Sequence, residues 1–137
     1  MQIQIRSDVK AVAEDCVRGS DESRMPFPEV VQRLNAVGVE RYNADLCRAE
    51  KIFYTPDGAS HAVPCGALDK APSLDFSAEG IAGALHAIQA KTITYHDFCE
   101  RIAAAGCVSY LVSLSGRCAI YSGRNGESFV ERFPPAL

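Results

Sequence analysis

Hydrophobic residues recur at helical spacing in four segments of the chain, each bounded by a polar residue or a glycine. Ser7, Ser77 and Thr94 stand where a helix would start and can accept hydrogen bonds from its first amides. Gly38 and Gly106 stand where two helices would end, because glycine adopts the left-handed conformation that other residues resist. The expected helices are Asp8–Arg18, Phe27 or Pro28 to Val37, Ala78 to about Ala90, and Tyr95–Ala105.

In the remaining segments apolar positions alternate with polar ones, which is the pattern of half-buried strands. In the first strand, Tyr42 and Ala44 lie on one side, whereas Arg41, Asn43 and Asp45 lie on the other. Glycine, proline and asparagine between the strands predict tight turns. The expected strands are Arg41–Leu46, Lys51–Thr55, Ala59–Val63, Cys107–Leu114, Arg117–Ser122 and Glu127–Phe133, with turns at Pro56-Asp57-Gly58, Ser115-Gly116 and Arg124-Asn125-Gly126.

The two halves of the chain repeat each other, since Phe27–Gly58 aligns without gaps on Tyr95–Gly126, 68 residues later. Each half predicts two helices followed by three strands, too little to close a core alone. We therefore expect a single α+β domain, residues 1–137, with an internal duplication of this unit about a pseudo-twofold axis. The first repeat spans about 7–64, the connection 65–76 and the second repeat about 77–133.

The two repeats are expected to combine about six antiparallel strands in one sheet or barrel, with four helices on one face. Two small sheets packed on each other are the alternative. What the halves share is turn glycines and core residues, and no nucleophile, acid or metal ligand is present in both. Seven aligned positions are identical: Arg33/Arg101, Ala36/Ala104, Gly38/Gly106, Tyr42/Tyr110, Leu46/Leu114, Ile52/Ile120 and Gly58/Gly126.

Composition disfavours several classes of function. A net charge of −3 and a pI near 5.6, with scattered Lys and Arg, are unlike the basic surface that binds nucleic acid. No segment approaches the ~20 apolar residues of a membrane span, and the N-terminus lacks the order of a signal peptide. We expect a cytoplasmic protein that binds neither nucleic acid nor membrane. The six cysteines contain no C-x-x-C pair and are expected to be free thiols.

Two stretches, Pro26–Gly58 and Gly106–Pro134, carry a family likeness through MPFPEVVQRLNAVGVERYNADL and GRCAIYSGRNGESFVERFP. They resemble the YbcV-like family of uncharacterised bacterial and prophage proteins, whose members are often labelled phage envelope protein. The resemblance implies a phage-related protein of unknown function and no particular catalytic residue. The lack of a membrane segment argues against a literal envelope protein.

The strongest candidate surface is the sheet face that the helices leave open. There the first half presents charged residues, whereas the second presents hydroxyls, and we expect one aromatic residue from each half beside them. Such a mixture is suited to a small molecule or a peptide, and it also occurs on any solvent-exposed sheet. The candidate binding residues are Arg41, Asn43, Asp45, Phe53, Ser109, Ser113 and Tyr121.

Other reactive residues lack a supporting pattern. The histidines do not show the i, i+4 spacing of a helical zinc pair, so we expect neither a metal nor a cofactor. Cys99 lies near a helix start, but it aligns with Val31, which indicates packing. The leading hypothesis is a non-catalytic module that binds a small molecule or a protein. The alternatives are a hydrolase or transferase using Cys99 or the Arg41/Asp45 hairpin, and a structural homodimer paired through an edge strand.

Overall fold

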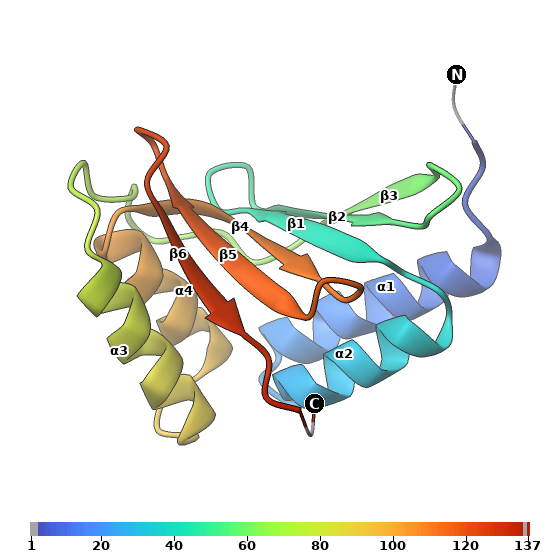
Figure 1. Ribbon diagram of the computed structural model, residues 1–137, viewed down its shortest axis with the longest axis horizontal. Coiled ribbons are helices and arrows are strands. Elements are labelled where there is room, and N and C mark those ends of the chain that lie inside the picture. Colours follow the sequence, from blue (N-terminus) through green and yellow to red (C-terminus); the bar gives the residue numbers. More distant parts are fainter. Residues whose placement is uncertain (1–2, 136) are drawn as a thin grey trace.

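The computed structural model describes residues 3–135 and 137 and shows two helices followed by three strands in each half of the chain (Figure 1). The helices match the expected segments to within a few residues at each end. They are α1 (Ser7–Asp21), α2 (Phe27–Ala36), α3 (Ala78–Gln89) and α4 (Tyr95–Ala104). The strands are β1 (Arg41–Asp45), β2 (Glu50–Tyr54), β3 (Ser60–Pro64), β4 (Cys107–Ser113), β5 (Cys118–Gly123) and β6 (Ser128–Arg132).

All six strands form one antiparallel sheet in the order β3-β2-β1-β4-β5-β6. The first strands of the two halves, β1 and β4, pair at its centre, where Tyr42 lies opposite Val112 and Ala44 opposite Tyr110. This pairing confirms the α+β fold and rules out the alternative of two separate sheets. The last strands of the halves, β3 and β6, are its edges, and a homodimer through either edge stays a prediction.

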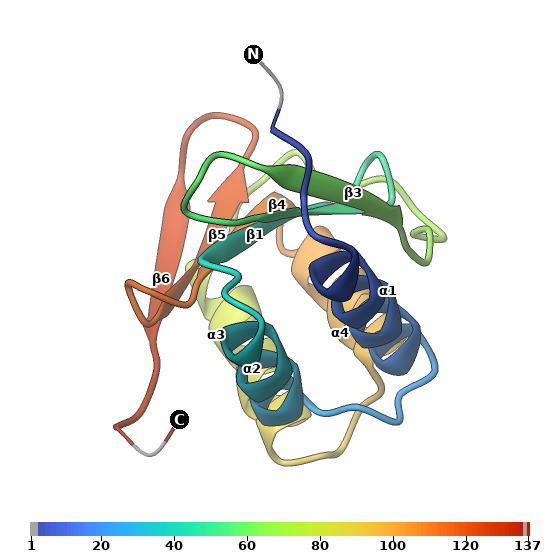
Figure 2. The same ribbon diagram turned by 90° about the vertical axis from the view of Figure 1, so that its right-hand side faces the viewer.

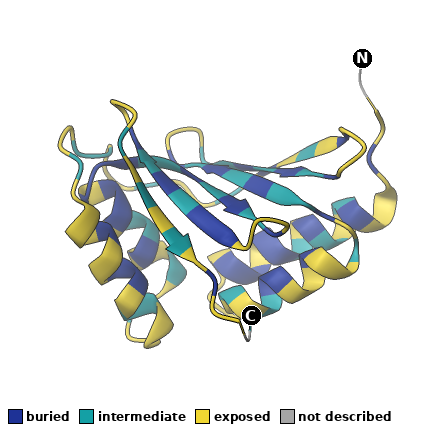
Figure 3. Ribbon diagram, in the orientation of Figure 1, coloured by how far each residue is buried: buried dark blue, intermediate teal, exposed yellow. Residues whose placement is uncertain are grey.

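The four helices lie on one side of the sheet, which we call the covered face (Figures 1 and 2). Residues of β1 and β2 alternate between buried and half-buried, because successive side chains point to opposite faces. Figure 3 shows the buried positions where helices and sheet meet. One hydrophobic core extends through both halves, and we call the other side of the sheet the open face.

Positions 68 residues apart have matching surroundings in the two halves. Tyr42 packs on Phe53 with ring centroids 5.1 Å apart, and Tyr110 packs on Tyr121 at 5.2 Å. Backbone conformation follows the same offset, since the positive-φ residues in the described part of the chain come in four such pairs. These are Ser23/Lys91, Gly38/Gly106, Ala49/Arg117 and Gly58/Gly126.

Local capping agrees with the sequence in the second half and differs in the first. Ser77 accepts a hydrogen bond from the amide of Gly80, and Thr94 forms a reciprocal capping box with Asp97. Ser7, however, is the first helical residue and does not cap α1, because the chain enters the helix one residue earlier, at Arg6.

The hairpin between β4 and β5 also differs from the expectation. Its left-handed residue is Arg117 (φ 55°), not Gly116.

None of the described helices has both the length and the apolar character needed to cross a membrane.

Candidate binding site

Five of the seven residues predicted for binding lie together on the open face. Arg41 pairs with Ser113, and Asp45 pairs with Ser109 across the central β1–β4 ladder, with Asn43 between them. All five are half-buried. They form a polar strip at the centre of the sheet, in which Leu111, the partner of Asn43, separates the two serines.

The charged members of this strip are already engaged by neighbouring groups. The Arg41 guanidinium lies 3.9 Å from the centre of the Tyr54 ring and makes a 3.1 Å ion pair with Glu40. The Asp45 carboxylate accepts two backbone hydrogen bonds of 3.0 Å from the following turn. These contacts stabilise the β1–β2 hairpin and engage both charges of the strip.

Phe53 and Tyr121 do not share the open face, so the expectation that they complete this surface is wrong. Only 1% of Phe53 and 5% of Tyr121 is exposed. Phe53 lies opposite Tyr42 and Tyr121 lies opposite Tyr110, and all four rings point toward the helices. A side chain shares the face of its cross-strand partner, so the inward position of Tyr42 also places Phe53 inward.

The covered face contains a pocket that the sequence did not lead us to expect. Its volume is about 70 Å³, and the most deeply buried of its charged residues is Lys51 of β2, which is 4% exposed. We call it the Lys51 pocket. Besides Lys51, its lining consists of Asp21, Ala44, Asp45, Leu46, Ala49, Cys65, Gly66, Ala67, Leu68, Tyr95, His96 and Cys99.

Lys51 is buried without a carboxylate partner. Its Nζ lies 4.4 Å from the centre of the Tyr95 ring and 6.0 Å from that of Tyr42. Among residues 3–135 and 137, no ion pair involves this amine. Buried lysines are rare unless they are paired, so an aromatic ring in place of a carboxylate makes Lys51 the most unusual charge in the described chain.

Burial controls the protonation of the pocket. It lowers the pKa of Lys51, because the charged ammonium loses its hydration. Burial raises the pKa of Cys99 to about 11, and it also raises the pKa of Cys65 and of Tyr95. The thiols and the phenol therefore stay protonated near neutral pH. For Lys51, in contrast to these thiols and this phenol, burial shifts the protonation equilibrium toward the nucleophilic form, which is the neutral amine.

A family model matches residues 15–132, and its description is Protein of unknown function (DUF1398). The chain belongs to this family. The match extends from within α1 to the last residue of β6 and includes every residue of the Lys51 pocket. The comparison with curated proteins finds no match. The narrower YbcV-like resemblance and the phage label remain predictions.

In this member of the DUF1398 family, the equivalent place in the other half of the chain is packed with apolar side chains. Phe133 contacts Phe27 there, edge to face, with ring centroids 5.5 Å apart. Cys65, the counterpart of Phe133, is too small to fill the same space, which leaves the pocket open. The pocket residues and their counterparts 68 positions away are Lys51/Ala119, Cys65/Phe133, Tyr95/Phe27 and Cys99/Val31. The fold therefore does not require a lysine or a pocket at this place.

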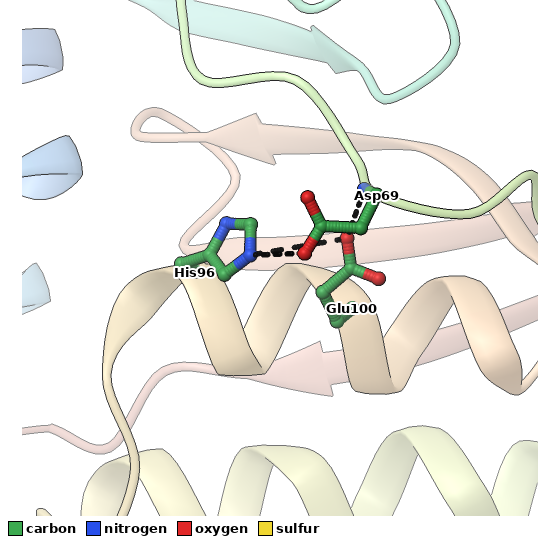
Figure 4. Close-up of side chains that lie close together, drawn as sticks. All are labelled: Asp69, His96 and Glu100. Carbon is green, nitrogen blue, oxygen red and sulfur yellow. Dashed lines mark hydrogen bonds and ion pairs between the residues drawn. The ribbon is translucent and has the colours of Figure 1, made fainter.

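A cluster of three charged residues stands beside the pocket (Figure 4). His96 and Glu100 lie one turn apart on α4, and Asp69 comes from the connection between the halves. The His96 Nε2 is 3.1 Å from Asp69 Oδ2 and 4.0 Å from Glu100 Oε1. Ligand atoms of the three lie within 4.8 Å of one another, a spacing that suits a divalent metal.

Contacts within this cluster already satisfy its members. The Asp69 amide donates to Glu100 Oε1, and the hydrogen bond to Asp69 raises the pKa of His96. The cluster thus ties the connection to α4 through the hydrogen bonds of Asp69 with His96 and Glu100. No hydrogen bond joins His96 to Cys99 among the described residues, and the raised pKa of this thiol disfavours the nucleophile alternative.

Two signals in the sequence point to the Lys51 pocket, although neither identifies it alone. In the alternating pattern of β2, Lys51 has the same phase as Phe53, which places a charge on the buried face. The alignment of the halves also sets Lys51 against Ala119. The contact with Tyr95 and Cys99, which arrive from α4, depends on how the two halves pack.

Proposed function

We propose that this protein is a non-catalytic module that binds a small molecule in the Lys51 pocket. The ligand presents an acceptor oxygen to the Lys51 amine, and its short apolar body contacts the alanine and leucine side chains of the lining. The observation that carries this proposal is that Lys51, which is only 4% exposed and makes no ion pair with a described carboxylate, lines a pocket. At the equivalent place of the other half, Phe133 fills the space instead. A ligand oxygen would replace the hydration that burial removes.

The volume limits the size of the ligand. About 70 Å³ has room for a few water-sized groups, so molecules with a short carbon chain and one carbonyl group fit best. The free state of all six cysteines supports a reducing compartment and, with it, the expected cytoplasmic location.

The test measures thermal unfolding of the full chain in the presence of acetamide, propionamide and longer amides. These probes supply an acceptor oxygen and do not react with amines. A ligand at 100 times its dissociation constant adds about 2.7 kcal/mol, which for a chain of this size raises the melting temperature by roughly 8–13 °C.

Two variants make the result specific to the site. Lys51→Met removes the donor and should abolish the shift, whereas Lys70→Met, at an exposed lysine, changes the net charge equally and should retain it. A shift that persists in Lys51→Met, or no saturable shift with any amide, would overturn the proposal.

A further inference from the structure

We propose that Lys51 captures small uncharged aldehydes as a reversible imine. This inference rests on the proposed function, because it names the ligand class of the same pocket and adds a covalent bond to the binding. It stands on three features of the pocket: the position of the amine, the charges at the lining, and the neutrality of the competing nucleophiles.

The amine is held where a carbonyl carbon can reach it. Lys51 is almost completely buried, yet it lines the pocket, and its Nζ is positioned over the Tyr95 ring at 4.4 Å. A desolvated amine that makes no ion pair keeps a larger neutral fraction than an exposed lysine, and the lowered pKa of Lys51 agrees with this. A neutral amine has the free electron pair that attack on a carbonyl requires.

The charges around the pocket favour an uncharged ligand over an anion. Asp21 is in the lining and its charge acts on Lys51, so a ligand carboxylate would meet a like charge. Asp21 accepts a hydrogen bond from the Gly66 amide, and the imidazole of His96 is paired with Asp69. The like charge of Asp21 therefore disfavours keto acids and selects simple aldehydes.

The neighbouring nucleophiles do not compete at neutral pH. Burial raises the pKa of the Cys99 thiol to about 11 and raises that of Cys65, so neither forms much thiolate. The Tyr95 hydroxyl is hydrogen-bonded to the hydroxyl of Tyr110. The lysine amine is thus the pocket group most able to attack an aldehyde.

The reaction balances without an oxidant or a reductant. The nitrogen lone pair of Lys51 forms a bond to the carbonyl carbon, and the carbonyl oxygen takes the proton that nitrogen loses, which gives a carbinolamine. The C–O bond then breaks and water leaves with a second nitrogen proton, so the net change is amine plus aldehyde to imine plus water. The bond is reversible by hydrolysis, which is consistent with a binding module.

Reductive trapping tests the inference. The full chain near neutral pH is exposed briefly to propanal with a limiting amount of cyanoborohydride, which converts an imine into a stable propyl amine that peptide mass spectrometry locates. The exposed side chains of Lys70 and Lys91 serve as internal controls in the same sample. We expect Lys51 to gain its propyl group at least tenfold faster than either control, and excess propionamide to slow its modification selectively.

The outcomes separate this inference from the proposed function. Labelling of Lys51 no faster than Lys70 overturns the imine, and if propionamide still raises the melting temperature of the parent chain but not of Lys51→Met, the binding proposal survives. Loss of both the thermal shift and the selective labelling overturns both. Lys51→Arg, which keeps a charge but cannot form an imine, should show no modification at position 51.

Discussion

Replacing Lys51 with methionine should stabilise the protein, although the change removes a residue of the core. Methionine keeps most of the packing volume of the lysine stem and has no charge to desolvate. A charged group transferred from water to such a site loses several kcal/mol of hydration. Lys51 is only 4% exposed and makes no ion pair with a described carboxylate, so the charge of Asp21 recovers only part of that loss, and the pKa of Lys51 is lowered.

The interaction with Tyr95 sets the size of the net effect. A desolvated ammonium over an aromatic face gains up to about 2 kcal/mol, and the Nζ of Lys51 lies 4.4 Å from the ring centre. Subtracting this gain from the hydration loss leaves a net gain for Lys51→Met of about 1–3 kcal/mol near pH 7. For a chain of this length, this corresponds to a rise in melting temperature of roughly 3–15 °C.

The stabilisation should depend on pH, and the sign of the dependence identifies the lysine. The pKa of Lys51 is lowered from 10.5 in the folded state, so between its folded value and 10.5 the unfolded chain binds more protons than the folded one. The cost of burying Lys51 is thus fully present below the folded pKa and disappears as the pH rises to 10.5. The advantage of Lys51→Met should shrink from near pH 7 to near pH 10.

Urea denaturation of the parent chain and of Lys51→Met at both pH values measures this difference directly. The buried tyrosines and thiols also titrate in this range, but they contribute equally to both proteins and cancel in the comparison. Lys70→Met, at an exposed lysine, should change the free energy of unfolding by less than about 0.5 kcal/mol. A loss of more than 1 kcal/mol in Lys51→Met near pH 7, unchanged at the higher pH, would refute the reasoning and make Lys51 a structural residue.

Two further predictions concern single sites elsewhere in the fold. With its pKa raised from 9.0 to about 11, Cys99 should react with iodoacetamide near pH 7 about 100-fold more slowly than an unperturbed thiol. Exposed Cys47 is the reference in the same chain, and equal rates, located by peptide mass spectrometry, would restore the nucleophile alternative. Gly106→Ala should lower the free energy of unfolding by about 3 kcal/mol or more, because the added Cβ would lie 2.3 Å from the Asp75 carbonyl oxygen. Gly38→Ala, with a similar φ and open space around it, is the control and should lower it by only about 1–2 kcal/mol. Equal losses in urea denaturation would mean that the backbone near Asp75 moves aside without an energetic penalty.

Local signals predicted the elements well because the forces behind them act over a few residues. The helix start at Thr94 and the helix end at Gly106 follow from a side-chain cap and from a positive φ, both of which involve only adjacent residues. Ser7 shows the limit of such signals, since a serine one residue inside a helix has the same sequence context as a cap. The observed ends of the helices and strands therefore differ from the predicted ends by a few residues, whereas each predicted helix or strand is of the predicted type.

The candidate site was predicted less well, because it joins residues that are distant in the sequence. Arg41, Asn43 and Asp45 reached the open face as their alternation with Tyr42 indicates. Phe53 was assigned to the wrong face because pairing across strands, rather than position within a strand, decides which residues share a side. The same pairing carries Lys51 inward.

By itself, the sequence determined the order of helices and strands, the buried side of the first strand and the correspondence of positions 68 residues apart, because hydrophobic spacing and turn chemistry are local properties. Only the tertiary structure decided that β1 and β4 join the halves in one sheet and that α4 of the second half packs beside β2 of the first. The ring of Tyr95 thereby lies against Lys51, 44 positions earlier in the chain, while Phe133 fills the equivalent place in the other half. The pocket exists because close packing responds to side-chain volume: one half has a phenylalanine where the other has a cysteine, and that difference has an effect only after the two halves have come together.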